Sequence, residues 1–263
     1  MRIAFIGGGA MGEAIVKCLL TKKVAAPQDM VVSDISPVRR DLLSREYGVG
    51  TLSDNREAVA NASLIILAVK PQNLPQVMEE IKTPSSEQLV LSIVAGATLS
   101  SLCQGLNHSS VIRAMPNMPA QIGEGMTIWT ATTETGQRQK KLAQTVLGTL
   151  GKEIYVADEK YLGMATALSG SGPAYVFLFI EALIDAGVHI GLPRDMAQEL
   201  VIQTILGSTR TVEKTGRHPA DLRNMVTSPG GTTTEALLQL EKGGFRSLIL
   251  EAVAAAYKKA ERL

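Results

Sequence analysis

Gly7, Gly9 and Gly12 stand where a short apolar run gives way to a helical pattern. The segment Gly7-Gly8-Gly9-Ala10-Met11-Gly12 has the spacing G-x-G-x-x-G. In this spacing the first glycine permits a tight turn, the second lets the backbone approach a pyrophosphate, and the third lets helix and strand pack closely. The helix that begins at Ala10 and Met11 would offer N–H groups and a positive dipole end to phosphates. The turn therefore predicts a dinucleotide site, with a plain tight turn in an α/β domain as the alternative.

The next apolar run ends in a pair of residues that gives conflicting signals about the nucleotide. It ends at Ser33-Asp34, and Arg39-Arg40 follow closely. An acidic residue here commonly bonds the ribose hydroxyls and favours NAD, whereas serine with nearby arginines suits the 2′-phosphate of NADP. A solvated helix face is an equally good interpretation of the two arginines.

Two further apolar runs end in residues suited to ligand binding. One ends in Ala68-Val69-Lys70-Pro71 and the next in Val94-Ala95-Gly96. Open α/β sheets bind their ligands at the carboxyl ends of parallel strands. Lys70 could contact a phosphate or a substrate there, or it could be an ordinary surface lysine.

A hydroxyl-rich turn near the C-terminus is the second candidate site. It reads Thr227-Ser228-Pro229-Gly230-Gly231-Thr232-Thr233-Thr234-Glu235. Thr232 and Glu235 have the spacing of a capping box, and the Pro-Gly-Gly turn would expose backbone N–H groups ahead of a helix. Because the loop contains no Lys or Arg, it suits a small carboxylate better than a phosphate chain. A well-capped helix would account for Thr232 and Glu235, but not for the other hydroxyls.

Another Gly/Ser turn, Leu168-Ser169-Gly170-Ser171-Gly172-Pro173-Ala174-Tyr175, opens a helix with proline in its first turn. Close helix approach explains its small residues at least as well as ligand contact does.

The elements that must position these residues change character along the chain. Short runs rich in Val and Ile, apolar on both faces, alternate with helical patterns in the first half, which predicts a doubly wound parallel sheet. The expected strands are 3–6, 30–33, 64–69, 89–94, 111–115 and 125–131, and a helix is expected over 136–150. After about residue 160 only helical spacing remains, over 173–187, 194–212 and 234–261 with a break near Gly243-Gly244.

Composition excludes several classes of protein. The 263 residues carry 26 Lys+Arg against 25 Asp+Glu, so the net charge of +1 gives no electrostatic signature of nucleic-acid or membrane binding. The two cysteines have no metal-ligand spacing. The uncharged stretch 161–180 is interrupted by Gly, Ser and Pro, which predicts a buried core helix rather than a membrane span. The N-terminus lacks a signal-peptide pattern, so a cytoplasmic location is expected.

Together these motifs resemble the pyrroline-5-carboxylate reductases. The resemblance spans the chain and rests on FIGGGAMGEA, AVKPQ, VIRAMPNMPA, LSGSGPAY and MVTSPGGTTTEAL. It implies an N-terminal Rossmann domain over 1–160 and an all-helical dimerisation and substrate domain over 161–263. It also implies homodimers that often assemble into decamers, and reduction of 1-pyrroline-5-carboxylate to L-proline, the last step of proline biosynthesis, with NADPH or NADH.

The resemblance also implies roles for individual residues. The dinucleotide would contact Gly7, Gly9, Ala10, Met11 and Gly12, have Ser33 and Asn55 at its adenosine end, and meet Ala68, Val69, Lys70, Pro71 and Ala95 toward the nicotinamide. Ser228 and the backbone of Gly230, Gly231, Thr232 and Thr233 would hold the substrate carboxylate, with the Thr233 hydroxyl directed at the ring nitrogen. The chain departs from the family at Asp34, where many members carry a non-acidic residue, and at Gly216, where Glu is common.

Reduction of a protonated C=N bond requires orientation and exclusion of water more than it requires a strong acid. Thr233 is accordingly a candidate hydrogen-bond donor. Another imine reductase or a β-hydroxyacid dehydrogenase is the nearest alternative, although the latter uses a lysine that is missing between Tyr161 and Arg194. A non-catalytic dinucleotide sensor is the alternative from a different class.

Overall fold

The computed structural model describes residues 1–82 and 84–262. Internal contacts divide the chain into two compact units. One contains Met1–Ser171 together with the chain end from Ala256, and the other contains Gly172–Ala255.

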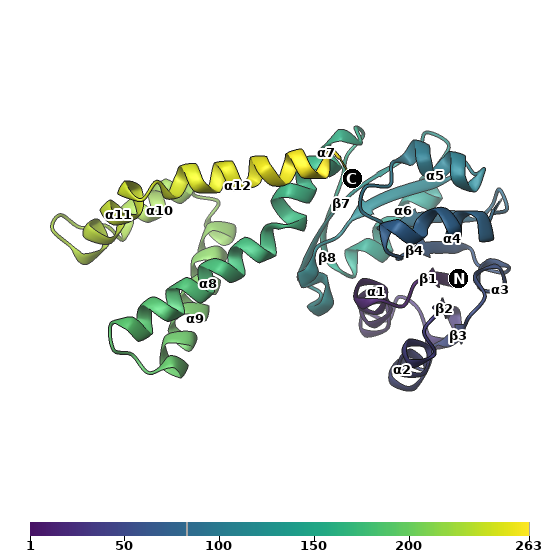
Figure 1. Ribbon diagram of the computed structural model, residues 1–263, viewed down its shortest axis with the longest axis horizontal. Helices are drawn as coiled ribbons and strands as arrows, with labels where there is room; N and C mark the ends of the chain where they lie inside the picture. The colour runs from purple at the N-terminus through teal and green to yellow at the C-terminus, as the bar shows by residue number, and fades with distance from the viewer. Residues whose placement is uncertain (83, 263) are drawn as a thin grey trace. The chain divides into compact units, whose positions relative to one another are not determined.

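The first unit is built on one sheet of eight strands in the order β3-β2-β1-β4-β5-β6-β7-β8 (Figure 1). The strands are β1 (Ile3–Ile6), β2 (Met30–Ser33), β3 (Gly50–Leu52), β4 (Leu64–Leu67), β5 (Leu89–Ser92), β6 (Val111–Met115), β7 (Gly125–Ala131) and β8 (Gly151–Tyr155). All neighbours pair in parallel except β6 and β7. The order runs outward in both directions from β1, which confirms the doubly wound arrangement.

Helices connect the strands of this unit. They are α1 (Ala10–Thr21), α2 (Pro37–Tyr47), α3 (Asn55–Val59), α4 (Leu74–Glu80), α5 (Leu99–Leu106), α6 (Gln137–Gly148) and α7 (Lys160–Ala165). Ser36 caps α2, Asp54 caps α3 and Thr98 caps α5 through their side-chain oxygens. These short polar residues satisfy backbone N–H groups that the first helical turn leaves unpaired.

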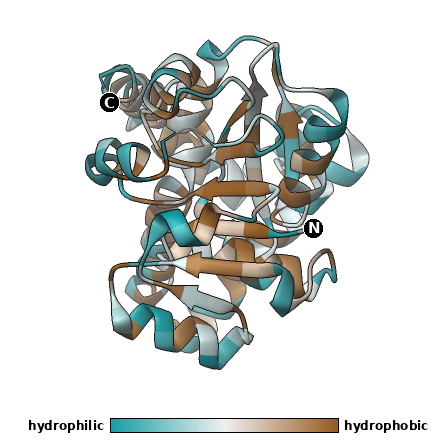
Figure 2. Cartoon of the chain, turned by 90° about the vertical axis from the view of Figure 1, so that its right-hand side faces the viewer, coloured by the Kyte–Doolittle hydropathy of each residue, from teal (hydrophilic) through white to brown (hydrophobic). Residues whose placement is uncertain are grey.

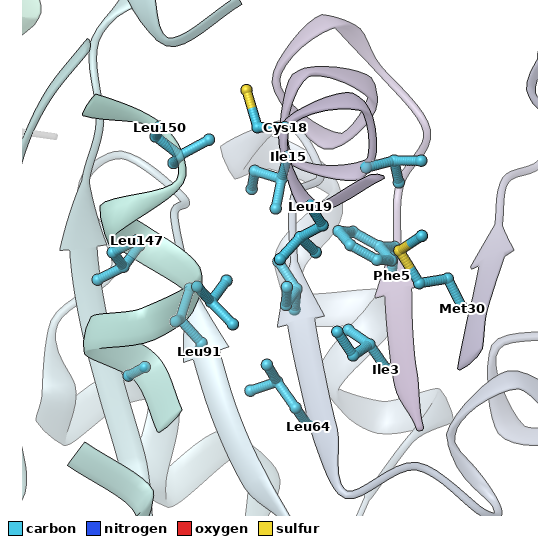
Figure 3. Packing of buried hydrophobic residues seen from close by; sticks show 14 of the residues in the cluster. Ile3, Phe5, Ile15, Cys18, Leu19, Met30, Leu64, Leu91, Leu147 and Leu150 are labelled. Carbon is cyan, nitrogen blue, oxygen red and sulfur yellow. The ribbon is translucent and has the colours of Figure 1, made fainter. Parts of the chain in front are cut away.

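The two faces of the sheet bury two separate hydrophobic cores. Ile3 and Phe5 of β1 pack into one cluster with residues of α1, α2 and α6, whereas Ala4 and Ile6 pack into the other with residues of α3, α4 and α5. Figure 2 shows the strands as the hydrophobic part of this unit, and Figure 3 shows Phe5, Ile15 and Leu19 within the first cluster. Strands buried on both faces are why the sequence runs are continuously apolar rather than alternating.

The far edge of the sheet departs from the expected parallel order. The nine residues between β6 and β7 form only the short 3-10 helix Met118–Ile122. A parallel crossover needs a dozen or more residues, so this connection returns the chain antiparallel.

The second unit is entirely helical among its described residues (Figure 1). Its helices are α8 (Gly172–His189), α9 (Arg194–Thr215), α10 (Pro219–Met225), α11 (Thr232–Lys242) and α12 (Phe245–Ala260), of which the last turn, from Ala256, belongs to the first unit. Gly244, with φ of +71°, separates α11 from α12 at the predicted break. The all-helical second half is confirmed, and α10 was not anticipated.

The expectation of a buried core helix at 161–180 was wrong. The helix continues through a π-helical turn at Thr166–Gly170, so the Gly/Ser/Pro stretch does not break it. In α8 only Ile184 is buried, and Leu178 is 67% exposed. By length and hydropathy the segment Lys160–His189 could cross a membrane, although one such helix is weak evidence. The residues that the structure describes do not cover its apolar surface, and exposed surface of this kind marks an interaction site.

Candidate functional site

The glycine turn lies between β1 and α1 and is held by close backbone packing. Gly7 has a φ of +103°, which glycine adopts without the strain that other residues would incur. A Cβ at Gly7 would lie 2.7 Å from the carbonyl oxygen of Ala68, and one at Gly12 would lie 2.4 Å from that of Gly7. At Gly9 a Cβ would meet nothing within 4 Å. Two of the three glycines are therefore needed by the fold, whereas Gly9 leaves an open surface.

Two side chains that follow β2 in the sequence bond the N–H and the carbonyl oxygen of Gly8. The Gly8 N–H donates to Oδ2 of Asp34 at 2.8 Å, and the Ser36 N–H donates to Oδ1 at 2.8 Å. On the other side, Nε and Nη2 of Arg39 both donate to the Gly8 carbonyl oxygen. The turn is thus preorganised by two residues that the sequence had placed near the adenosine end of a nucleotide.

A small charged network anchors Arg39 in turn. Its Nη2 lies 2.7 Å from Oε2 of Glu13, and the Tyr47 hydroxyl donates to Oε1 of Glu13 at 2.8 Å. Burial alone would raise the pKa of Glu13, but the hydrogen bonds from Arg39 and Tyr47 outweigh it and lower the pKa. Burial and the bond to Glu13 raise the pKa of Tyr47 to about 12.

A cleft of about 630 Å³ opens over the carboxyl ends of β1, β2 and β4. Eight of the predicted cofactor residues line it: Gly7, Gly9, Ser33, Asp34, Asn55, Ala68, Val69 and Lys70. Sequence reasoning did not assign Ile35, Ser36, Gln72, Asn73, Gln76 or Glu80, which also line it. Their place in the sequence could have identified them. Each lies within a few residues of the carboxyl end of a strand, or on the helix that lines the cleft.

Five predicted cofactor residues do not line this cleft: Ala10, Met11, Gly12, Pro71 and Ala95. Gly12 is buried beneath the turn, and its contact with Gly7 makes its role one of packing. Ala10 and Met11 form the first turn of α1, where N–H groups have no partner within the helix. Pro71 and Ala95 follow β4 and β5, at the same edge of the sheet.

The residues of the cleft fit a dinucleotide. Ser33 is 1% exposed, and its Oγ has no hydrogen-bond partner although it belongs to the cleft lining. A buried hydroxyl without a partner is costly, so a ligand that bonds it gains that energy. Together with the open surface at Gly9 and the start of α1, this gives a hydroxyl-binding point and a phosphate-binding point in one cleft.

The hydroxyl-rich turn in the second unit has a defined conformation. Gly230 has a φ of +69°, and the Gly231 N–H donates to the Ser228 carbonyl oxygen at 3.0 Å. The Thr234 hydroxyl donates to the same oxygen at 2.8 Å. Ser228 is exposed, and Thr233 is partly exposed in the first turn of α11.

The predicted capping box at this turn was wrong. Gly231 occupies the N-cap position, and Thr232 is the first residue of the helix rather than its cap. No side-chain oxygen caps α11 among the described residues, and the Thr234 hydroxyl bonds the Ser228 carbonyl oxygen. The N–H groups of the first turn, including those of Thr232 and Thr233, therefore remain free of a side-chain cap, as an anion site requires.

The Gly/Ser turn at 168–175 serves packing within the first unit. A Cβ at Gly170 would approach the Met115 side chain to 3.3 Å. Nδ2 of Asn117 donates to both the carbonyl oxygen and the hydroxyl of Ser169 at 3.2 Å. These contacts are with β6 and with the loop that follows it, so the predicted close approach between helices stays a prediction.

The histidines take structural positions. Nδ1 of His218 accepts a hydrogen bond from the Ala220 N–H and caps α10. His108 is buried, and its Nε2 lies 2.9 Å from the carbonyl oxygen of Gln88.

Comparison with known proteins agrees with this architecture. Residues 159–263 match the family described as pyrroline-5-carboxylate reductase dimerisation, and residues 2–96 match that of the coenzyme F420-dependent NADP oxidoreductases. A pyrroline-5-carboxylate reductase of Synechocystis sp. is 43% identical over 263 residues, covering 100% of this chain and 98% of the relative. The dimerisation match supports self-association.

Solved structures show the same relationship. A pyrroline-5-carboxylate reductase from Coxiella burnetii superposes with a TM-score of 0.90 at 38% identity, covering 99% of this chain and 97% of that one. A pyrroline carboxylate reductase of Plasmodium falciparum with NADP bound superposes with a TM-score of 0.91 at 32% identity, covering 100% and 97%. The full-length identity shows the family, and the fold and the cleft at the glycine turn are consistent with it. The chain belongs to the pyrroline-5-carboxylate reductase family.

Proposed function

We propose that this chain reduces 1-pyrroline-5-carboxylate to L-proline by hydride transfer from NADPH or NADH, the last step of proline biosynthesis. The observation that carries the proposal is the 43% identity, over the full length, to the pyrroline-5-carboxylate reductase of Synechocystis sp.. The cleft, whose lining residues fit a dinucleotide, supports it. Another imine or β-hydroxyacid dehydrogenase, and a dinucleotide sensor, are the alternatives that the experiments below separate.

The cofactor-binding residues act by cradling phosphates and bonding hydroxyls. The open face of Gly9 and the first-turn N–H groups of Ala10 and Met11 receive the pyrophosphate. The unpartnered hydroxyl of Ser33 and the amide of Asn55 serve the adenosine end. Residues 68–71 and Ala95, at the ends of β4 and β5, border the nicotinamide.

The substrate-binding residues act by holding a small anion. The Ser228 hydroxyl and the backbone N–H groups of Gly230, Thr232 and Thr233 receive the substrate carboxylate, whereas the Gly231 N–H donates to the Ser228 carbonyl oxygen and so shapes the turn. Positive φ at Gly230 and the bond from Gly231 to Ser228 set the course of this backbone. Fixed N–H donors require no reorganisation when the anion binds, which favours orientation of the ring.

The chemistry requires one hydride and one proton. A reduced nicotinamide held by the cleft residues would supply the hydride for the ring carbon of the C=N bond, and the ring nitrogen would gain one proton to become the amine of proline. The Thr233 hydroxyl donates a hydrogen bond to the lone pair that this nitrogen carries in the neutral imine and again in the amine product, and so orients the ring. Since a hydroxyl is too weak an acid to protonate the imine alone, Thr233 is a positioning donor in this scheme, and the proton comes from water.

In this proposal the two domains expected from the sequence have separate roles. Residues 1–160 bind the dinucleotide, and residues 161–263 form the dimer and bind the substrate. The family match at 159–263 and the exposed apolar residues of α8, α9 and α12 support a homodimer. Assembly of dimers into a decamer and a cytoplasmic location stay predictions of the sequence.

An isotope experiment tests the reaction directly. The protein is incubated with 1-pyrroline-5-carboxylate and NADH or NADPH that carries deuterium at both C4 positions of the nicotinamide, and the product is analysed by mass spectrometry and chiral chromatography. We expect L-proline with one deuterium at the ring carbon that belonged to the C=N bond. Unlabelled proline, or no proline from protein that binds the dinucleotide, would reject hydride transfer to this substrate.

A further inference from the structure

The loop that follows β5 lies beside the end of the cleft proposed for the nicotinamide. Strands β4 and β5 are neighbours in the sheet, and the Ile93 N–H donates to the Leu67 carbonyl oxygen at 3.0 Å. Residues 68–70, which follow Leu67 directly, line the cleft. A dinucleotide with its adenosine over β2 extends across the crevice toward β4 and β5. The course of the loop 93–98 therefore helps to shape the space that a nicotinamide would occupy.

Small residues make up the middle of this loop. It reads Ile93-Val94-Ala95-Gly96-Ala97-Thr98, and Gly96 has a φ of +78°. The Val94 N–H donates to Oγ of the buried Ser92 at 3.2 Å, which fixes the start of the loop. Because residues 95–97 carry no polar side-chain atom, groups from other elements must hold the end of the loop.

Glu159 holds the end of the loop. It directly precedes α7, and its Oε1 accepts the N–H of Leu99, the first residue of α5, at 2.8 Å. The Thr98 hydroxyl oxygen accepts the Ser101 N–H at 3.1 Å. Two side-chain oxygens therefore fix the point at which the loop becomes helix, and the negative charge of a carboxylate is favourable at a helix N-terminus.

Arg113 of β6 orients the Glu159 carboxylate. Its Nη1 donates to the same Oε1 atom at 2.7 Å, and its side chain is only 14% exposed. Arg113 lies opposite Ser92 in the pairing of β5 with β6, so its backbone belongs to the interior of the sheet. A hydrogen bond between charged groups is stronger than one between neutral groups. Because Oε1 accepts both donors, the sheet holds Glu159, and Glu159 holds the loop.

We propose that Glu159 is a positioning residue for hydride transfer, because it fixes the loop 93–98 in the conformation that borders the nicotinamide. Glu159 does not line the cleft, so it acts on the dinucleotide only through the loop. The proposal rests on the proposed function and on the contact proposed there between Ala95 and the nicotinamide. Misplacement of reacting atoms by about 1 Å can slow a reaction about 100-fold, so a small shift of the loop is enough to matter.

The test is the rate of hydride transfer in a single turnover of the full-length protein. Protein in excess over NADPH or NADH is mixed with 1-pyrroline-5-carboxylate, and the loss of the reduced-nicotinamide absorbance is followed by stopped flow. Calorimetry gives the dissociation constant and the number of dinucleotide sites, so the rate is expressed per occupied site. A variant that merely folded poorly would lose sites, but each remaining site would keep its rate.

Glu159→Ala should lower the rate per site by about tenfold to 100-fold, because the loop loses its anchor. The dissociation constants should change by less than about threefold, since the phosphates and the adenosine bind elsewhere. Glu159→Gln keeps an oxygen that the Arg113 guanidinium directs at the Leu99 N–H, so its rate should stay near that of the wild type. Asp158→Ala is the matched control: it removes the neighbouring carboxylate, which bonds Lys160, and should leave the rate unchanged.

A further variant separates the charge of Glu159 from its reach. Glu159→Asp keeps the negative charge but shortens the side chain by one methylene group, so the carboxylate no longer reaches the Leu99 N–H. It should therefore be slower than Glu159→Gln. This comparison tests the proposal even where Glu159→Ala does not fold.

Three results would overturn the proposal. The first is a wild-type rate per site in Glu159→Ala. The second is a Glu159→Gln protein as slow as Glu159→Ala or Glu159→Asp, because the bond to Leu99 would then not account for the loss. The third is an equal loss in Asp158→Ala, which would be an effect of local charge. Failure of the proposed function would look different: the wild type itself would bind the dinucleotide without oxidising it, which would overturn both proposals.

Discussion

Two glycines three residues apart in the same turn should respond in opposite ways to the same substitution. A Cβ at Gly12 would lie 2.4 Å from the Gly7 carbonyl oxygen, with the Ala68 Cβ at 3.6 Å behind it. At Gly9 no atom lies within 4 Å, and the φ of −67° is open to any residue. Gly12→Ala should therefore damage the fold, and Gly9→Ala should damage cofactor binding.

The expected magnitudes follow from these contacts. Overpacking costs about 1–3 kcal/mol, and the upper end applies at Gly12 because the obstacle is backbone in a turn that cannot move freely. Replacing glycine by alanine inside a helix returns about 1 kcal/mol, which leaves a loss of about 2 kcal/mol in the free energy of unfolding. At Gly9, an N-cap position, the same change should cost less than about 1 kcal/mol.

Binding should show the reverse order. A methyl group at Gly9 would occupy the surface that the pyrophosphate approaches and would lengthen its hydrogen bonds to the helix N–H groups. We expect the dissociation constant for NADH and for NADPH to rise about tenfold or more, equivalent to about 1.4 kcal/mol. A valine at Gly9 should have a larger effect.

The assay pairs thermal unfolding without ligand, followed by circular dichroism, with calorimetric titration of each dinucleotide. A loss of about 2 kcal/mol should lower the melting temperature of Gly12→Ala by about 4–8 °C at this chain size. Normal dinucleotide binding by Gly9→Ala would refute the assignment of this turn to the cofactor. Wild-type stability of Gly12→Ala would refute the packing argument.

Three further outcomes follow from the structure. Thr233→Ala should keep the dinucleotide affinity but lower kcat about 100-fold, because one positioned donor is lost. The control Thr211→Ala removes a hydroxyl from the exposed helix α9 and should leave kcat unchanged. Unchanged turnover in Thr233→Ala would remove Thr233 from the mechanism. The pKa of Tyr47, raised from 10.0 to about 12, means that the unfolded chain loses this proton first as pH rises. The contribution of Tyr47 to stability should thus be complete below pH 10 and lost toward pH 12, and chemical denaturation of Tyr47→Phe should show a smaller alkaline decline; an identical decline in both proteins would contradict this. Leu250→Glu places a charge at a leucine of α12 that is 71% exposed, and sedimentation should show a shift toward monomer, whereas an unchanged assembly would place Leu250 outside the interface.

The sequence predicted the interior of the sheet well because burial on both faces leaves a continuous apolar run. The strand Ile3–Ile6 has the same bounds in the structure, and its four residues alternate between the two cores. Edge strands lack this signal. β3 has only three residues, and β8 begins with glycine and carries Lys152 and Glu153, so neither shows a buried pattern.

The candidate site was predictable where a residue type is dictated by backbone geometry. Positive φ at Gly7 and Gly230 requires glycine, and both positions were identified. Partners that depend on tertiary contact were not predictable. Nothing in the local sequence indicates that Asp34 and Arg39 converge on the peptide of Gly8, because that contact exists only once β1 and β2 pair side by side.

The most direct test of the central claim is the absorbance of the reduced nicotinamide in the presence of 1-pyrroline-5-carboxylate and either NADPH or NADH. We predict oxidation that requires the substrate, that proceeds with both dinucleotides, and that is about 100-fold slower in Thr233→Ala. The contrary result is a folded protein that binds the dinucleotides but oxidises neither NADPH nor NADH when 1-pyrroline-5-carboxylate is present. That result would contradict the assignment and favour another imine substrate or a dinucleotide sensor.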